Sequence, residues 1–356
     1  MKKVVDYIIV GQGLAGTLLH YFLSKEGKKV IVIDAHHKAA ASKVAAGTIN
    51  PVTGRRYVKS WLVEKLIPFA TQTYRALEQD LGVYFYHPMP VLRTLANRRE
   101  ELAWEDRLLN EYYAQYMKEE ADLGNYQGFV NEDYKYGEVK QSAQVEAGKL
   151  VDVYRKTLEE KQEILTGVFD FERLILKEDS VQYDRIRAQK VLFCEGNQAK
   201  KNPFFNYLPF LGAKGEALIV KIPSTNFESM LKQRVFIIPL PNDLYWIGAT
   251  SDKQYENDLP TTKGKQYLVE HLKEILDLPF EILEHKAAIR PTVKDRRPFL
   301  GLHPEYPQLA IFNGLGTKGA SLGPYFAQHM VAHLIENKPL MKEVDIERYH
   351  PLRGKK

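Results

Sequence analysis

The chain has 356 residues, of which 44% are hydrophobic and 27% charged. This length and composition indicate a globular protein of about two domains. Fifty basic and 45 acidic residues give a formal net charge of +5, which allows an anionic partner without requiring one. The single cysteine, Cys194, excludes an internal disulfide and any multi-cysteine metal site.

The cellular location is predicted from the same features. A lone cysteine fits a reducing cytoplasm, which we expect as the location. No stretch approaches the ~18 apolar residues of a membrane span. The apolar run at the N-terminus is interrupted by Asp6, so we expect neither a signal peptide nor a membrane span.

The first 35 residues predict a strand, a glycine turn, a helix and a second strand. Residues 4–10 are apolar and β-branched, as in a buried parallel strand. The helix has Leu14, Leu18 and Phe22 at four-residue spacing and ends near Gly27. The second strand, 28–35, contains Asp34, 18 positions beyond Gly16.

Further elements follow in chain order. We expect a loop at 41–54 and helices at 66–81, 97–120 and 149–158. Strands are predicted at 164–175, 190–194, 216–222, 234–240 and 244–250, the last two as a hairpin. Helices are expected again at 263–276 and 321–337.

The order of these elements predicts the fold class. Parallel α/β character lies at both ends of the chain, and a strand meander lies between them. We therefore expect an α/β protein (α+β as a whole), with a Rossmann-like nucleotide-binding domain interleaved with an antiparallel-sheet substrate domain. The first domain is assigned residues 1–82, 141–210 and 284–356. The second is assigned residues 83–140 and 211–283.

The sequence GQGLAG, residues 11–16, is typical of a dinucleotide site. Gly11 permits a tight turn, Gly13 lets the backbone approach a pyrophosphate, and Gly16 lets the helix pack on the strand. Asp34 is placed to accept hydrogen bonds from a ribose and disfavours a 2′-phosphate. The motif alone leaves NAD and FAD open.

A second glycine-rich stretch, FNGLGTKGASLGP at residues 312–324, precedes the last predicted helix. It is either a loose surface turn or a backbone segment that must lie very close to another group.

Five segments together resemble the FAD-dependent D-amino-acid oxidase and glycine oxidase superfamily. They are DYIIVGQGLAG with VIVID, ASKVAAGTINP, VLFCEG, RVFIIPLPNDLYWIGATSD, and IRPTVKDRRPFLG followed by NGLGTKGASLGP. In that family the third segment usually has alanine where Cys194 stands. The resemblance implies an FAD-dependent oxidoreductase whose late glycine loop lies against the flavin ring.

The resemblance also implies which residues contact FAD. Besides Gly11, Gly13, Gly16 and Asp34, these are Leu14, Ala15, Ala35, Ser42, Ala45, Ala46, Gly47, Thr48, Cys194, Gly196, Gly314, Leu315, Gly316, Thr317, Lys318 and Gly319. Neither flavin-contacting loop contains cysteine or histidine, so we expect non-covalent FAD. His36 and His37 are interpreted as solvated residues, and no metal is expected.

Two substrate residues are implied. Arg290 matches the family's arginine that binds a substrate carboxylate, although it could instead pair with Asp295. Phe236 stands where glycine oxidases have a substrate-facing tyrosine, or it only packs within the hairpin. Tyr245 and Trp246 point to opposite faces, so one of them is expected to line the pocket.

Several functions remain open at this point. The first is FAD-dependent oxidation of the C–N bond of a small amino acid or N-substituted glycine. The second rests on GTINP, GLGTKG and RYHPLRGKK, which resemble the oxidase half of the bifunctional tRNA wobble-uridine enzyme, although Lys318 replaces that family's arginine. There the reaction removes a carboxymethyl group, and Arg55, Arg56 and Lys59 would contact tRNA phosphates. An NAD-linked dehydrogenase and a non-catalytic flavoprotein are the other readings.

Overall fold

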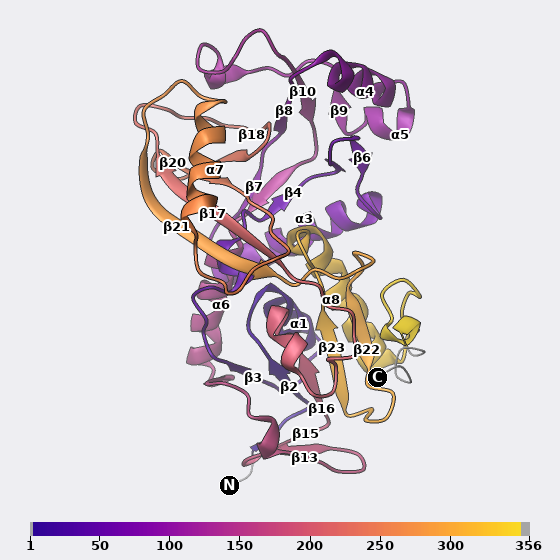
Figure 1. The fold of residues 1–356 in the computed structure, drawn as a ribbon. Helices are drawn as coiled ribbons and strands as arrows, with labels where there is room; N and C mark the ends of the chain where they lie inside the picture. Colours follow the sequence, from indigo (N-terminus) through magenta and orange to yellow (C-terminus); the bar gives the residue numbers. More distant parts are fainter. Residues whose placement is uncertain (1–2, 350–356) are drawn as a thin grey trace.

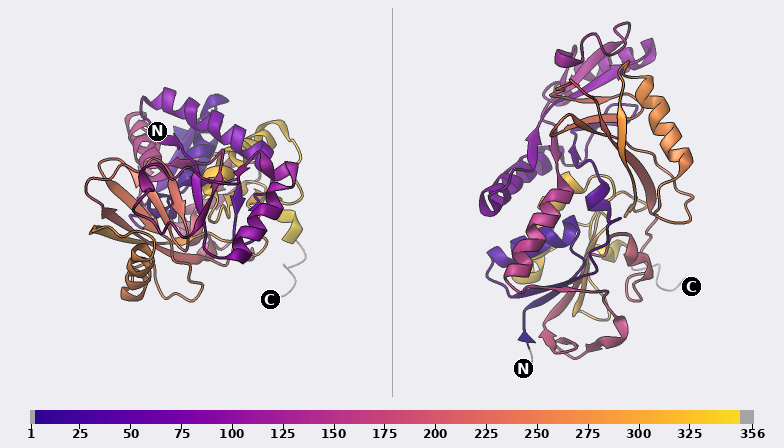
Figure 2. Two further views of the ribbon diagram at one scale, coloured as in Figure 1. Left: turned by 90° about the horizontal axis from the view of Figure 1, so that it is seen from above. Right: turned by 90° about the vertical axis from the view of Figure 1, so that its left-hand side faces the viewer.

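The computed structural model describes residues 3–349. Figure 1 shows a lower region, which contains β2, β3 and α1, and an upper region built around a large sheet. The chain passes between them several times, so each region is made of segments that are far apart in sequence (Figures 1 and 2). The part of the basic ending RYHPLRGKK from residue 350 onward lies outside the described residues.

The lower region is centred on a six-stranded sheet. Its order is β12 (Ile164–Thr166), β3 (Val30–Asp34), β2 (Tyr7–Val10), β16 (Lys190–Phe193), β23 (Leu309–Asn313) and β22 (Phe299–Leu302). All neighbours are parallel except β22 and β23. Such a sheet needs cover on both faces.

Both faces of this sheet are covered. Ile9 of β2 belongs to a core shared with the helices α1 (Leu14–Lys25), α3 (Val63–Leu81) and α8 (Gly319–Glu336). Ile8 belongs to a second core, on the opposite face. There the sheet meets a four-stranded sheet of β1 (Lys3–Val4), β15 (Ile186–Ala188), β14 (Val181–Tyr183) and β13 (Leu174–Leu176).

Two strands predicted as continuous are divided. The run 4–10 becomes β1 and β2 in different sheets, because Asp6 turns its carboxylate to the Lys29 N–H at 2.7 Å. The run 164–175 becomes β12 and β13, separated by a 3₁₀ turn, Phe171–Arg173, whose start is capped by Asp170.

The upper region is an eight-stranded sheet. Its order is β21 (Glu281–Arg290), β17 (Ala213–Lys221), β20 (Leu244–Gly248), β19 (Phe236–Leu240), β18 (Met230–Lys232), β8 (Val91–Leu95), β10 (Lys135–Val139) and β9 (Met117–Lys118). Only β18 and β8 are parallel. The helix α7 (Thr262–Lys273) packs on one face. The predicted domain boundary at residue 284 falls inside β21.

Helix predictions were accurate except in one region. The helices α3, α7 and α8 and α6 (Ala147–Glu160) lie where expected, within three residues at each end. The single helix predicted at 97–120 is wrong: it is α4 (Arg98–Leu108), α5 (Glu111–Ala114) and then β9. The side chains of Asn97 and Asn110 accept hydrogen bonds from backbone N–H groups two or three residues later in the chain, so each asparagine caps the start of a new helix.

Short elements complete the chain. The predicted loop at 41–54 contains the short helix α2 (Ala41–Val44). Two small sheets are formed by β4 (Thr48–Ile49), β11 (Ala143–Val145) and β7 (Tyr86–Pro88), and by β5 (Val52–Thr53) and β6 (Val58–Lys59). Two further 3₁₀ turns are Gly124–Tyr126 and Gly196–Lys201. The predicted α/β architecture, a Rossmann-like region with a largely antiparallel second sheet, is confirmed.

Candidate active site

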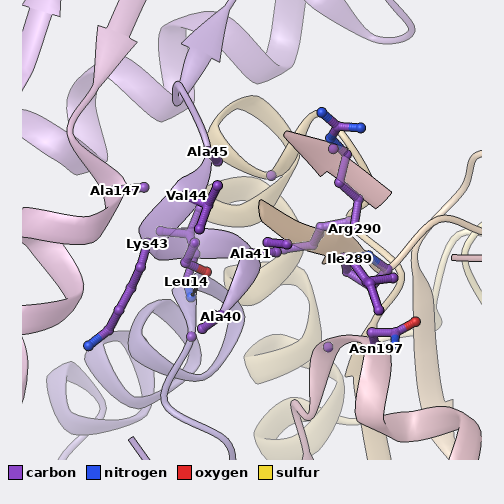
Figure 3. A pocket seen from close by; sticks show the side chains of 18 of the residues that line it. Leu14, Ala40, Ala41, Lys43, Val44, Ala45, Ala147, Asn197, Ile289 and Arg290 are labelled. Carbon is purple, nitrogen blue, oxygen red and sulfur yellow. Dashed lines mark hydrogen bonds between the residues drawn. The ribbon is translucent and has the colours of Figure 1, made fainter. Parts of the chain in front are cut away.

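A cavity of about 490 Å³ lies where the carboxyl ends of β2, β3 and β16 meet the eight-stranded sheet. Figure 3 shows Ile289 and Arg290 on one side of it and Leu14, Lys43 and Val44 on the other. In open α/β sheets, ligands bind at this edge. Both regions of the molecule therefore contribute to one site.

The first glycine turn has the geometry that its sequence predicts. Gly11 has φ +98°, and a β-carbon there would lie 2.5 Å from the carbonyl oxygen of Cys194. A β-carbon at Gly16 would lie 1.9 Å from the Gly11 oxygen, so Gly16 serves helix packing. Gly13 precedes α1 and lines the cavity. The N-terminus of α1 is thus presented to the cavity.

Asp34 lies at the end of β3 beside this turn. Its carboxylate accepts hydrogen bonds from the N–H groups of Gln12 at 2.9 Å and His36 at 2.8 Å. It also pairs with Arg155 of α6 at 3.0 Å. Three donors leave room for a further one on the carboxylate. Sequence reasoning missed Arg155, because no local pattern links α6 to β3.

The segment around α2 is tied to both regions. Ser42 Oγ accepts a hydrogen bond from the N–H of Leu14 at 2.9 Å. The indole of Trp246, on β20, donates to the Val44 carbonyl at 3.0 Å. Trp246 is thereby the member of its pair that lines the cavity, whereas Tyr245 is buried and hydrogen-bonded to Thr225.

The late glycine stretch is packed against the cavity. The N–H of Gly316 donates to the carbonyl of Pro291 at 3.1 Å, and Gly316 has φ +58°. Gly319 and Ala320, which begin α8, also line the cavity. The N-terminus of α8 therefore faces the same space as that of α1.

The structure brings most of the predicted cofactor residues together. Those that line the cavity are Gly11, Gly13, Leu14, Ala15, Asp34, Ser42, Ala45, Ala46, Gly47, Thr48, Cys194, Gly196, Leu315, Gly316, Thr317 and Gly319. Four do not line it: Gly16, Ala35, Gly314 and Lys318. A β-carbon at Gly314 would meet Val293 at 2.9 Å, and Lys318 points to Ser60 at 2.9 Å.

Arg290 lies at the end of β21 with its guanidinium across Gly215, where a β-carbon would be 1.9 Å from Nη2. Both terminal nitrogens donate to the Thr250 carbonyl at 3.2 Å. No ion pair joins Arg290 to a carboxylate within residues 3–349, and Asp295 pairs instead with Arg348. Burial lowers the pKa of Arg290 from its usual value. The guanidinium therefore retains free donors in a partly desolvated place.

The wall near Arg290 is aromatic and cationic. Phe236 of β19 lines the cavity, as predicted, together with Trp246. The ammonium of Lys232 lies 4.7 Å from the centre of the Phe236 ring. Sequence reasoning missed Lys232, which also lines the cavity.

A family model described as FAD dependent oxidoreductase matches residues 6–333. The chain belongs to this family. FAD is its cofactor, and the NAD-linked dehydrogenase reading is withdrawn.

Within residues 3–349 no cluster of three or more histidine, cysteine or acidic side chains is arranged to hold a metal. No helix in that range has the length and apolar character to cross a membrane.

Curated relatives of this flavoprotein are distant. The chain is 26% identical to the bifunctional protein ThiO/ThiG of Trichormus variabilis over 97% of its length. It is 22% identical to the glycine oxidase of Bacillus subtilis, covering 96% of both chains. It is 21% identical to the tRNA 5-methylaminomethyl-2-thiouridine biosynthesis bifunctional protein MnmC of Marinobacter nauticus. The chain spans 55% of the ThiO/ThiG protein and 58% of the MnmC protein.

Solved structures share the fold. The glycine oxidase of Bacillus cereus superposes with a TM-score of 0.79 at 21% identity, covering 94% of this chain and 96% of the other. The iminodiacetate oxidase of Chelativorans sp. superposes with a TM-score of 0.78 at 20% identity, covering 97% and 98%.

The cavity fits FAD. The cavity lining includes a glycine turn without β-carbons, two helix N-termini and Asp34. Groups of this kind suit a pyrophosphate and a ribose. Bound FAD supplies a two-electron acceptor, and the protein supplies binding, orientation and electrostatics. We expect the α8 N-terminus to stabilise negative charge on the flavin.

We predict that Gly316→Val will shift the flavin absorbance spectrum or weaken FAD retention. Gly316 lines the cavity, and a β-carbon there would come no closer than 3.7 Å to an atom outside its chain neighbourhood, so a changed flavin spectrum would not result from a clash of that β-carbon within the protein. Gly27→Val is a matched control, because Gly27 also has positive φ, +69°, but lies outside the cavity lining. An unchanged spectrum and affinity in Gly316→Val would show that this loop does not contact the flavin.

Glu195 provides a pH-dependent prediction for the apoprotein. Burial raises its pKa to about 7, against a hydrogen bond from Asn202 that lowers it. The native carboxyl then holds its proton up to about pH 7, whereas the unfolded one loses it near 4.5. The unfolded state binds fewer protons in this window, so stability falls as pH rises from about 4.5 to 7.

The size of this effect is about 3 kcal/mol, from the two pKa values. Glu195→Gln keeps an acceptor for Asn202 and removes the titration. Urea unfolding at pH 5 and pH 8 should show a smaller loss of stability in the variant than in the wild type. Equal losses would contradict the assignment.

Proposed function

We propose that the protein catalyses FAD-dependent oxidation of the C–N bond of a small amino acid or N-substituted glycine. The observation that supports this proposal most strongly concerns Arg290. Its guanidinium reaches the flavin cavity and has no carboxylate partner within residues 3–349. A guanidinium fork matches a substrate carboxylate better than any other side chain does. The names of the glycine oxidase relatives agree with this substrate class.

The role of the protein in this reaction is positional. With its carboxylate on Arg290, the substrate loses hydride from the carbon beside nitrogen. Bound FAD would supply the acceptor for that hydride, and the lone pair of the neutral amine would form the C=N bond as the hydride leaves. Phe236 and Trp246 line this space with apolar surface, and a less polar surrounding strengthens an ion pair with Arg290. No acid–base triad is needed for such a reaction.

A second candidate is removal of a carboxymethyl group from a modified tRNA wobble uridine. The name of the Marinobacter relative favours it, and the reacting group would still be an N-substituted glycine. Arg55 and Arg56 line a separate cleft beside the flavin cavity. Lys59, also considered for phosphate contact, is paired with Glu64.

The test is anaerobic flavin reduction. Purified holoprotein would be mixed, without oxygen, with amino acids, N-methylated amino acids and carboxymethylamines, and flavin bleaching followed. We expect rapid bleaching with at least one N-bearing carboxylate. No bleaching with any of them, but bleaching with a simple amine, would contradict the proposal.

A further inference from the structure

A large cationic cleft lies on the upper region, outside the flavin cavity. It measures about 1360 Å³, and residues from β8, α4, the turn after β18, α7 and the segment 54–56 line it. Its cationic side chains are Arg55, Arg56, Arg93, Arg99, Arg107, Lys232 and Arg234. Its carboxylates are only Glu100, Asp106 and Glu274. We call this the Arg93 cleft.

The cations of the Arg93 cleft form no ion pairs in the part of the chain that the structure describes. Within residues 3–349, none of its seven cationic side chains forms an ion pair with a carboxylate. Arg93 Nε is buried and has no hydrogen-bond partner. Lys232 donates only to the carbonyl of Arg234, at 2.6 Å. Burial, helped by the nearby charge of Arg93, lowers the pKa of Lys232 to about 7. Arg93, Arg107 and Lys232 are partly buried, and a partly buried cation is costly unless an anion pairs with it.

The Arg93 cleft adjoins the flavin cavity, and Lys232 lies between them. Parallel pairing of β8 and β18 sets Arg93 beside Lys232, and the next pairing sets Lys232 beside Phe236. Adjacent residues in register project from the same face of a sheet. Lys232 lines both spaces. An anion held at Arg93 would therefore lie next to the part of the flavin-cavity wall that contains Lys232.

Lys232, at the edge of the Arg93 cleft, and Arg290 are far apart on the eight-stranded sheet. Lys232 shares a row with Lys286 of β21 through β19, β20 and β17, which is four strand spacings or roughly 19 Å. Arg290 is four residues farther along β21, about another 13 Å. Successive Cα atoms of a polypeptide are only ~3.8 Å apart. A ligand that reaches from the Arg93 cleft to Arg290 would therefore be much larger than an amino acid.

We propose that the Arg93 cleft binds the phosphate backbone of a single-stranded nucleic-acid segment. Arginine forks suit phosphate oxygens, and several unpaired cations along one groove suit a polyphosphate chain. Tyr134 and Tyr267 lie in the same lining, and Tyr267 is 40% exposed. Aromatic faces of this kind stack on bases, which an acidic peptide lacks. The proposal that the cleft binds nucleic acid is independent of the proposed oxidation. The proposal that the cleft guides a substrate to the flavin rests on that oxidation.

The test is fluorescence anisotropy of the holoprotein with a labelled single-stranded RNA of about 15 nucleotides. The double variant Arg55→Gln/Arg99→Gln removes two phosphate contacts. It should weaken binding about 25-fold at 0.1 M salt. It should also reduce the slope of log K against log salt concentration by about 1.4. Both residues are exposed, so folding should survive. Arg185→Gln/Arg187→Gln is the matched control, because these exposed arginines lie at β15, at the opposite end of the molecule (Figure 1).

Further arms identify the ligand class. Tyr267→Ala should weaken RNA binding but not binding of polyglutamate, because only RNA offers bases to stack. RNA binding that is absent, or equally weakened in both arginine pairs, would overturn the proposal. Polyglutamate that competes as well as RNA of equal charge would overturn it in favour of an acidic protein. Flavin reduction by small substrates is a separate readout, so failure of the oxidation proposal would be recognised independently.

Discussion

Replacing Arg290 with leucine should lower kcat/KM for carboxylate-bearing amines by roughly 30- to several-thousand-fold while FAD remains bound. Truncating one side of a desolvated, hydrogen-bonded charge pair costs about 2 to 5 kcal/mol, and each 1.4 kcal/mol is about tenfold. The wild-type guanidinium is held only by the Thr250 carbonyl, so its loss leaves little else unpaired. Anaerobic flavin reduction measures the effect.

Two variants and one substrate series sharpen this test. Arg290→Lys retains charge but loses the fork, so it should lie between wild type and leucine. Arg348→Leu breaks a structural ion pair with Asp295 and should lower stability without distinguishing substrates. Amines without a carboxylate should be nearly unaffected by Arg290→Leu. If that variant reduces flavin with amino acids at wild-type rates, the substrate class proposed for this protein is wrong.

Gly13→Val should yield folded protein that purifies nearly free of flavin. Gly13 has φ −76°, an ordinary value for valine. Within the protein, a β-carbon would meet only Ser42 Oγ, at 3.2 Å. Any large loss of FAD therefore reports the space next to the backbone that a pyrophosphate needs. Flavin absorbance per protein, with circular dichroism for folding, is the measurement.

Gly167→Val is the control for this substitution. A β-carbon at Gly167 has no neighbour within 4 Å, and the residue lies outside the cavity lining. We expect this variant to remain yellow. Fully yellow Gly13→Val protein would show that the first glycine turn does not bind the pyrophosphate.

Local patterns predicted much of the fold, and the family resemblance implied many of the residues that line the cavity. The turn at Gly11 depends on a positive φ and on close backbone contacts, and both require glycine. Buried parallel strands are recognisable as apolar runs. The helix at 97–120 was wrong because Asn110 can cap a helix as well as occupy one.

Features created by distant pairing could not be predicted. Arg93 and Lys232 become neighbours only through the pairing of β8 with β18, 139 positions apart in sequence. Arg155 reaches Asp34 from a helix 121 positions away. Neither pair leaves a mark in any local window, so the cleft and the buried ion pair required the structure.

The strand β21 continues from Arg290 directly into Pro291, whose carbonyl receives the N–H of Gly316. The residue proposed to hold the substrate is thus one peptide unit from a hydrogen bond to the loop proposed to hold the flavin. Misplacement of reacting groups by about 1 Å can cost 100-fold in rate. Phe236 and Lys232 stand on other strands, outside this connection. Evolution could therefore exchange them to admit a different substrate without disturbing the alignment on which the chemistry depends.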